Sequence, residues 1–210
     1  ARRLAGPGRL NRGRSTGKEI MERNIVLKDG RSIHIRPLMP ADADASLEFF
    51  FGLPPDERRY LRRDVTDPEV VLARIRENDS CEVERLVAVH DDLIVADGSF
   101  EHERYGWGEK IAQIRLIVAP DFRRTGLGTV LARLLYVIAN NHDVARINVR
   151  MLRPQAAARD IFRRLGFREE FILPDHVRDL DGNLQDLILM RCNLSMLCDG
   201  NLETSTNREG

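Results

Sequence analysis

The stretch AQIRLIVAPDFRRTGLGTVL, residues 112–131, decides the fold of this chain. Apolar residues at 112, 114, 116 and 118 fall on one face of a strand, with Gln113 and Arg115 on the other, and Pro120 ends that strand. After a turn that contains Gly126, apolar residues recur at helical spacing, which predicts a helix over residues 127–141. A strand, a glycine turn and an amphipathic helix therefore follow one another directly.

The start of that helix is a candidate anion site. The first amide groups of a helix have no partner within the helix, and the helix dipole adds partial positive charge there. Glycines at 126 and 128 let a phosphate approach the main chain without a Cβ in the way. Arg123 and Arg124 add formal positive charge beside these amides. The segment is therefore expected to bind an anion such as a phosphate group.

Two familiar phosphate-binding motifs do not fit this segment. A Walker A loop ends in Gly-Lys-Ser/Thr, whereas Gly128 is followed directly by Thr129. A dinucleotide fingerprint needs a third glycine where Leu131 stands, and an acidic residue about 20 positions further on. An ordinary helix start without a ligand stays open as the alternative.

The remaining sequence adds one element after another around this unit. Gly166 is expected in the left-handed conformation past the end of the last helix, with Phe167 making the accompanying apolar contact. The order is strand, helix, helix, three strands, helix, strand, helix, two strands, which indicates a mixed α/β (α+β) sandwich around one sheet of about seven strands with about four helices. Besides the unit above, strands are predicted at 33–36, 86–90, 93–100 and 145–151 and on both sides of Asp181-Gly182, and helices at about 42–51, 70–75 and 154–165.

Composition suits one domain with tails. The chain has 210 residues and is 42% apolar, enough for an ordinary core. Residues 1–24, which are basic, and residues 195–210, which are polar, are expected to be loose tails on a single domain over 25–194. The 33 basic and 33 acidic residues cancel, which argues against a dedicated nucleic-acid binder. Binding of nucleic acid through the arginines of the N-terminal tail remains a further hypothesis, and it predicts strong salt dependence.

The cysteines indicate the compartment. Cys81, Cys192 and Cys198 form no CxxC pair, so we expect neither a disulfide framework nor a metal site but reduced, buried thiols. Such thiols are typical of a cytoplasmic protein. No apolar run approaches the ~20 residues of a membrane helix, and no hydrophobic segment follows the basic N-terminal residues as in a secretory signal. We therefore expect a cytoplasmic protein without a membrane partner.

A family resemblance enters at the glycine turn. Arg123-x-x-Gly126-x-Gly128, between a strand and an amphipathic helix, resembles the pyrophosphate motif of the GNAT N-acetyltransferases. Residues 158–167 are similar to the last helix of that family with its Gly-Phe ending, and the likeness covers about 25–194. Within it, the start of the domain resembles the GNAT domain of bacterial protein lysine acetyltransferases.

The resemblance implies a mainly antiparallel GNAT-like sheet and acetyl-CoA, or another acyl-CoA, as co-substrate. The main chain at 116–118 would pair with the pantetheine arm like an added strand, and the amides of 124–129 would hold the pyrophosphate. Arg153, Arg159 and Arg163 would reach outlying phosphates, with a solvated charged face as the alternative. The implied cofactor-binding residues are Leu116, Ile117, Val118, Arg123, Arg124, Thr125, Gly126, Leu127, Gly128, Thr129, Gln155 and Phe162.

The catalytic positions depart from the family pattern. Related lysine acetyltransferases often carry a glutamate base where this chain has Gln113, and an amide cannot accept the proton. Glu101, His102 and Glu103 on the preceding strand are substitute candidates, and of these we select Glu103 as the catalytic residue. Exposed polar side chains or a water chain are the alternatives. Many members place a tyrosine acid where Phe162 stands. The CoA thiolate can leave without full protonation if its pKa resembles that of cysteine, about 8.5.

The expected function is N-acyl transfer from acetyl-CoA to the amine of a small molecule or protein. Arg115 shares a face with Gln113, so we expect either acidic groups around the acceptor or an acceptor whose carboxylate meets Arg115. Because the usual base and acid are missing, a non-catalytic acyl-CoA-binding sensor is the alternative. The residues leave the oligomeric state open, with a homodimer as one option.

Overall fold

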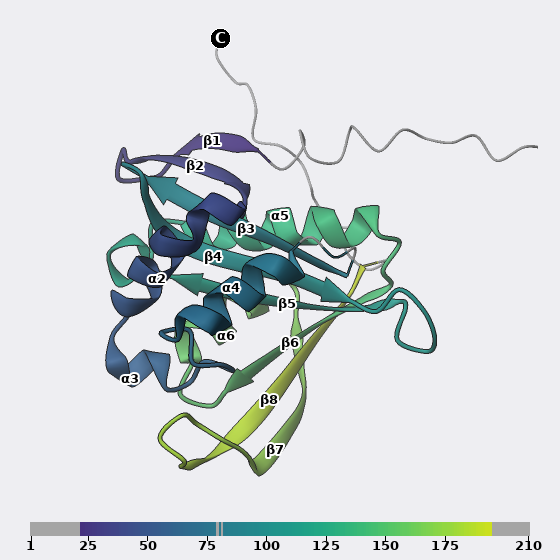
Figure 1. Cartoon of the computed structure of the whole chain (residues 1–210). Helices are drawn as coiled ribbons and strands as arrows, with labels where there is room; N and C mark the ends of the chain where they lie inside the picture. The colour runs from purple at the N-terminus through teal and green to yellow at the C-terminus, as the bar shows by residue number, and fades with distance from the viewer. Residues whose placement is uncertain (1–21, 79, 81, 195–210) are drawn as a thin grey trace, which may run out of the picture.

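A computed structural model describes residues 22–78, 80 and 82–194, and over this part the chain forms one eight-stranded sheet covered by helices (Figure 1). The strand order is β1-β2-β3-β4-β5-β6-β8-β7, and every neighbouring pair is antiparallel except β5 and β6. The strands are β1 (Arg23–Val26), β2 (Ser32–Pro37), β3 (Val83–His90), β4 (Leu93–His102), β5 (Ile111–Val118), β6 (Arg146–Leu152), β7 (Arg168–Arg178) and β8 (Leu184–Asn193). The helices are α2 (Ala43–Phe51), α3 (Pro55–Arg58), α4 (Pro68–Glu77), α5 (Leu127–Asn141) and α6 (Ala156–Arg164), with 3-10 turns at Pro40–Asp42 and Pro120–Phe122.

The helices bury two apolar cores, one on each face of the sheet. Helix α5 packs on β4 and β5, and its leucines at 127, 131 and 135 are fully buried. Gly98 of β4 permits this contact, since a Cβ there would lie 3.0 Å from Leu135 Cδ1. Helices α2 and α4 cover the other face, where Phe50 and Val71 belong to a second cluster. Apolar residues on both sides of the strands therefore contribute to the two cores.

The predicted mixed sheet is confirmed, with one more strand and one more helix than expected. Strand β1 begins at Arg23, two residues inside the expected tail, and α3 forms at the Pro54-Pro55 break. Gly166 has φ +87°, and Phe162 and Phe167 pack edge to face at 5.1 Å, so the predicted helix cap is confirmed. Residues 1–21 and 195–210 lie outside the described residues, as do Cys81 and Cys198.

The sheet is divided between β5 and β6. These parallel strands pair only at Ile111–Gln113 with Arg146–Asn148. Beyond Gln113, β5 continues against β4, and β6 continues against β8. The two strands therefore part and leave a gap in the middle of the sheet, which ends where β5 leads into the glycine turn.

Candidate active site

The glycine turn has the conformation of an anion cradle. Gly126 stands immediately before α5 with φ +96°, and Arg124 also has a positive φ of 61°. Thr125 Oγ1 donates to the carbonyl of Phe122 at 2.7 Å, which fixes the turn. Within the described residues, the amides of Arg124, Thr125, Gly126 and Gly128 donate no hydrogen bond. A Cβ on Gly126 would meet nothing within 4 Å, so the turn is open on that side.

Two of the expected amides are already engaged. The Thr129 amide donates to the Gly126 carbonyl at 3.0 Å as part of the helix. The Leu127 amide lies 3.5 Å from Thr125 Oγ1, and the Leu127 side chain is fully buried in the core. Of the expected run 124–129, the amides left free to bind an anion are therefore those of residues 124–126 and 128.

Gly128 has a packing role. A Cβ there would lie 3.2 Å from Ile161 Cδ1 of α6, 3.5 Å from Val118 Cγ2 and 3.6 Å from Leu116 Cδ2. The first distance is tighter than most real contacts of this kind. The glycine therefore lets the start of α5 approach both β5 and α6, which brings the cradle to the end of the gap.

The two arginines of the motif have different surroundings. Arg123 Nε donates to the Val118 carbonyl at 3.1 Å, and its two terminal nitrogens bind both oxygens of Glu57, one of them at 2.7 Å. The hydrogen bond with Glu57 raises the pKa of Arg123 above its ordinary value. Arg124 is exposed, and among the described residues its guanidinium has no ion pair. Arg123 therefore fastens α3 to the turn, and Arg124 is the cation without an ion pair; that both flank a phosphate stays a prediction.

The gap exposes main-chain groups of β5. The Ala119 amide donates to the Val95 carbonyl at 2.9 Å, and hydrogen-bonded pairs alternate along an antiparallel ladder. Ile117 is therefore also bonded to β4, whereas the N–H and C=O of Leu116 and the N–H of Val118 face the gap. The Val118 C=O already accepts from Arg123 Nε. Of the three residues expected to pair with an extended ligand, two are in position, and Ile117 can contribute only its side chain.

A cavity of about 570 Å³ lies at this gap. It brings together several predicted residues, because Gln113, Leu116 and Ile117 of β5 line it with Gln155 and Phe162. Phe162 is 2% exposed. Its ring closes the apolar side of the cavity and offers no hydroxyl. One wall is therefore apolar and carries free main-chain groups, as an extended thioester arm needs.

Gln155 spans the end of the gap. Its Oε1 accepts from the Leu152 amide at 2.8 Å, which joins the start of α6 to the end of β6. The side chain is thereby fixed in the cavity wall beside Ala158. The expected place of Gln155 next to the cofactor arm agrees with this position.

The three outlying arginines are already paired. Arg153 Nε lies 2.7 Å from Asp186 Oδ2. Arg159 Nε lies 3.7 Å from Glu169, and Arg163 binds the same carboxylate. These contacts favour the solvated charged face over phosphate binding.

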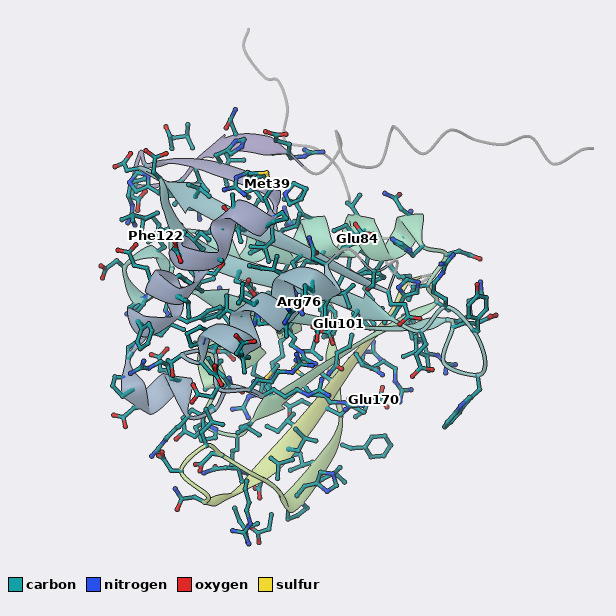
Figure 2. The ribbon with its side chains drawn as sticks, in the orientation of Figure 1. Met39, Arg76, Glu84, Glu101, Phe122 and Glu170 are labelled. Carbon is teal, nitrogen blue, oxygen red and sulfur yellow. The ribbon has the colours of Figure 1, made fainter. Side chains whose placement is uncertain are left out.

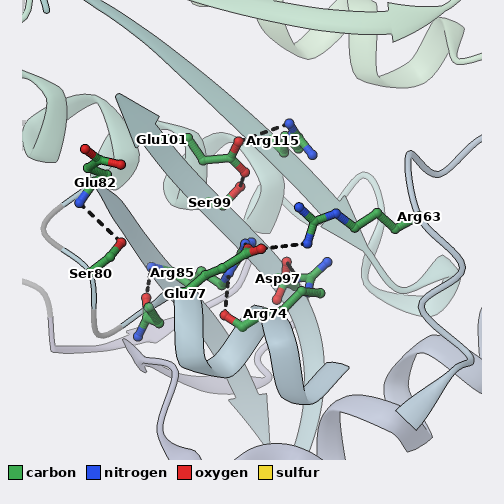
Figure 3. Close-up of polar contacts among 11 residues, drawn as sticks. Arg63, Arg74, Glu77, Ser80, Glu82, Arg85, Asp97, Ser99, Glu101 and Arg115 are labelled. Atoms are coloured by element: carbon green, nitrogen blue, oxygen red, sulfur yellow. Dashed lines mark hydrogen bonds and ion pairs between the residues drawn. The ribbon is translucent and has the colours of Figure 1, made fainter. Parts of the chain in front are cut away.

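Glu101 is the substitute candidate that lies in the cavity wall. In the β4–β5 register Glu101 lies opposite Gln113, and both line the cavity. Arg115 Nη2 donates to Glu101 Oε2 at 3.0 Å, and Ser99 Oγ donates to Oε1 at 3.2 Å. Figure 2 shows Glu101 near the middle of the molecule, and Figure 3 shows its two contacts. A carboxylate has about four acceptor positions, so it can still accept a further hydrogen bond.

The other two substitute bases lie elsewhere. Glu103 is exposed in the loop after β4 and does not line the cavity, and its carboxylate sits over Gly108. His102 turns to the opposite face, where its ring lies 5.1 Å from Phe100 and 4.7 Å from His142. Burial, with a smaller contribution from His142, lowers the pKa of His102. Glu101 therefore replaces Glu103 as our candidate.

The far part of the cavity is cationic. Burial lowers the pKa of Arg115 to about 10, and Arg62, Arg85 and Arg74 act in the same direction against the opposing effect of Glu101. Among the described residues the lining includes three carboxylates, Glu77, Glu101 and Asp179, and seven arginines, Arg62, Arg63, Arg74, Arg85, Arg115, Arg150 and Arg178.

Several of these arginines hold the wall together. Arg85, which is 5% exposed, lies 2.9 Å from Glu77, and Arg63 binds the same carboxylate at 2.7 Å (Figure 3). Arg74 lies 2.7 Å from the buried Asp97. These pairs fix α4 and the segment after α3 against the strands.

Other classes of site are not found in the described ranges. Over residues 22–78, 80 and 82–194 no helix is long and apolar enough to cross a membrane. The same residues contain no group of three or more histidine, cysteine, aspartate or glutamate side chains that could hold a metal ion. Cys192 is a buried free thiol, as expected, and burial raises its pKa.

The fold is of the GNAT type, and residues 82–169 match the family model described as an acetyltransferase (GNAT) domain. The chain is 29% identical over 147 residues to acetyltransferase Pat of Mycolicibacterium smegmatis, covering 68% of this chain and 43% of that relative. It therefore spans less than half of the length of this curated relative. The resemblance to the GNAT acetyltransferases is confirmed.

Solved structures show the same fold. The GNAT domain of S. lividans PAT superposes with a TM-score of 0.67 at 18% identity, covering 82% of this chain and 97% of that one. The structure of yncA of Salmonella typhimurium with its cofactor acetyl-CoA superposes with a TM-score of 0.66 at 18% identity, covering 83% of this chain and 98% of that one. The predicted GNAT-like fold is confirmed.

Four residues at the cavity and the turn were not predicted from the sequence, because they come from segments distant from the glycine motif. Glu57, Tyr60, Arg62 and Arg178 come from the α3 region and from β7, far from the glycine motif in sequence. Their only sequence signal was the density of arginines after α3. The alternation of β4 could have favoured Glu101, since Glu103 falls beyond the strand.

Proposed function

We propose that the chain is an acetyl-CoA-dependent N-acetyltransferase that acts by direct attack of an acceptor amine on the thioester. The observation that carries this proposal is the gap between β5 and β6, with main-chain groups of Leu116 and Val118 turned into it and the open Gly126 cradle at its end. A pantetheine arm fits such a gap as an added strand, and the free amides of the cradle suit a pyrophosphate. Arg124 supplies a cation beside them.

Acetyl-CoA would supply an activated acetyl group, and residues of the chain prepare the amine. An ammonium must lose its proton before the nitrogen can attack, since an alkyl ammonium has a pKa near 10.4. Glu101, which lines the cavity opposite Gln113, would accept that proton. The surrounding guanidinium groups lower the pKa of any ammonium placed among them, because like charges disfavour the charged form. Transfer forms the amide bond, breaks the C–S bond and releases the CoA thiol.

A second candidate is an acyl-CoA-binding sensor without turnover. Gln113 at the family base position and Phe162 at the acid position favour it, since neither can transfer a proton. The gap and cradle would serve the sensor equally well, so binding alone does not separate the two candidates.

Two measurements on the purified protein test these candidates. Calorimetry with acetyl-CoA is expected to show binding, and release of CoA thiol with a panel of amines is expected to show turnover. Binding without thiol release for any amine would support the sensor. No binding of CoA or its thioesters would refute both.

Location and partners follow from the same proposal. The cytoplasmic location stays a prediction from the cysteines, and cell fractionation with an antibody to the chain would test it. Whether the acceptor is a small molecule or a protein is the question that the shape and charge of the cavity address.

A further inference from the structure

The acceptor end of the cavity is roofed by two segments from distant parts of the chain. One is the segment after α3 with Tyr60 and Arg62, and the other is the turn between β7 and β8 with Leu180. The Leu180 amide donates to the Arg59 carbonyl at 2.9 Å, and Arg59 lies 3.4 Å from Asp181. A main-chain hydrogen bond thus joins the two segments, and Figure 1 shows α3 close to the β7–β8 turn. A joined roof over a cavity of about 570 Å³ suits a small acceptor.

Along the cavity, the arginines exceed the carboxylates available to them. Arg62 of the roof and Arg150 of β6 are exposed residues of the lining, and within the described residues their guanidinium groups have neither an ion pair nor a hydrogen bond. Arg62 is close enough to Arg115 to disfavour its charged form. Two neighbouring guanidinium groups in a partly enclosed space are stabilised by an anion between them. The described chain supplies only Glu101 to Arg115 and no anion to Arg62.

The floor of the same cavity carries opposite charges side by side. Arg115 and Glu101 lie 3.0 Å apart, and their side chains are 29% and 23% exposed. A molecule with an amine and a carboxylate a few bonds apart matches this pair, with its amine beside Glu101 and its carboxylate beside Arg115. A polyamine would place a second positive charge next to Arg62 and Arg115, which is unfavourable.

We propose that the acceptor is a small amino acid whose carboxylate binds between Arg62 and Arg115 while its amine lies beside Glu101. This inference rests on the proposed function and adds to it the class of acceptor. The unpaired Arg62 selects the carboxylate, and the link between Leu180 and Arg59 over the cavity favours a small acceptor.

The first experiment compares matched amines. Acetyl-CoA binding is measured first, so that failure of the proposed function is recognised separately. CoA thiol release is then followed with the twenty protein amino acids, β-alanine and 4-aminobutyrate. For each substrate, the corresponding carboxamide and the amine lacking the carboxylate serve as matched compounds. Loss of the carboxylate is expected to lower kcat/KM about 10- to 100-fold, the range for one charged hydrogen-bonded contact.

The second experiment removes the proposed carboxylate ligand. Arg62→Gln is expected to raise the KM for the amino acid about tenfold, to leave the Kd for acetyl-CoA unchanged, and to reduce the preference for acid over carboxamide by a similar factor, since Arg115 remains. Since Arg62 has no partner in the described chain, the variant is expected to fold normally. Arg133→Gln, on the exposed side of α5 away from the cavity, is the control and should match the wild type.

Three results would overturn the inference while the proposed function stands. They are equal turnover of an amino acid and its carboxamide, faster transfer to a lysine-containing peptide or a polyamine, and an Arg62→Gln variant with unchanged selectivity. Acetyl-CoA binding without transfer to any carboxylate-bearing amine would also overturn it.

Discussion

The substitution Gly126→Ala tests whether acetyl-CoA binding depends on the left-handed conformation of the glycine turn. Gly126 has φ +96°, where an L residue is strained by about 1–2 kcal/mol, although a Cβ there would meet nothing within 4 Å. If the turn relaxes to relieve this strain, regaining the binding conformation costs the same free energy. Since 1.4 kcal/mol is tenfold in an equilibrium constant, acetyl-CoA affinity should fall about 5- to 30-fold. Isothermal titration calorimetry measures this change directly.

Gly30→Ala is the matched control for this strain. Gly30 has φ +88° and equally open surroundings, but it lies in the turn between β1 and β2. Gly30→Ala should lose up to about 1–2 kcal/mol of unfolding free energy, which is about 2–8 °C in Tm for a domain of this size, and should bind acetyl-CoA as the wild type does. In Gly126→Ala the strain that the relaxed turn relieves should appear instead as weaker acetyl-CoA binding. If Gly126→Ala keeps the stability of the wild type, so that the turn has relaxed, and still binds acetyl-CoA as tightly, the cradle does not hold the pyrophosphate.

The remaining predictions concern the base, a buried ion pair and the free cation of the cradle. Glu101→Gln should lower kcat about 10²- to 10⁴-fold at neutral pH in thiol-release assays, with the Kd for acetyl-CoA unchanged; an unaltered kcat would exclude Glu101 as the base. Burial alone would raise the pKa of Asp42, but two hydrogen bonds from Arg36 at 2.7 and 2.8 Å and one from the Met39 amide outweigh burial and lower it. The stabilisation is therefore present above the unfolded carboxyl pKa of about 3.9 and is lost as the pH falls below it. At pH 7 the Tm values of wild type and Asp42→Asn should differ by the equivalent of about 1.5–3 kcal/mol. Below about pH 4 the two Tm values should converge. A constant difference across this range would contradict that account. Arg124→Gln should weaken acetyl-CoA binding at low salt, with a loss that shrinks in 0.5 M NaCl because screening already removes most of the attraction; a loss independent of salt would mean that Arg124 does not act through its charge.

The elements that could be predicted from the sequence are those whose pattern repeats over a few neighbouring residues. The alternation in β5 and the helical spacing of α5 each repeat within a few residues, so both elements and the turn between them were predictable. Strand β1 has four residues, mostly exposed, and therefore too little apolar pattern to be recognised. Helix α3 is a single turn after two prolines, which read equally well as a break.

The site was predictable where it depends on the main chain and unpredictable where it depends on long-range charge. The glycine turn binds through amides, whose availability follows from the start of a helix. Arg123 and Glu57 are 66 residues apart, and nothing in the sequence indicates that they pair. Glu101 and Glu103 are two positions apart, so an extended strand would place both on the same face. Only Glu101 lies within β4 and lines the cavity, and the sequence does not show where β4 ends.

The parting of β5 from β6 gives this sheet an edge in its interior. Until a ligand arrives, water must satisfy the amide groups of Leu116 and Val118, so they should exchange with solvent deuterium faster than their neighbours bonded to β4. An acyl-CoA molecule would supply the missing strand and slow that exchange. The metabolite level in the cell would then set how much of the protein is present with a completed sheet, and with it the resistance of the chain to proteolysis.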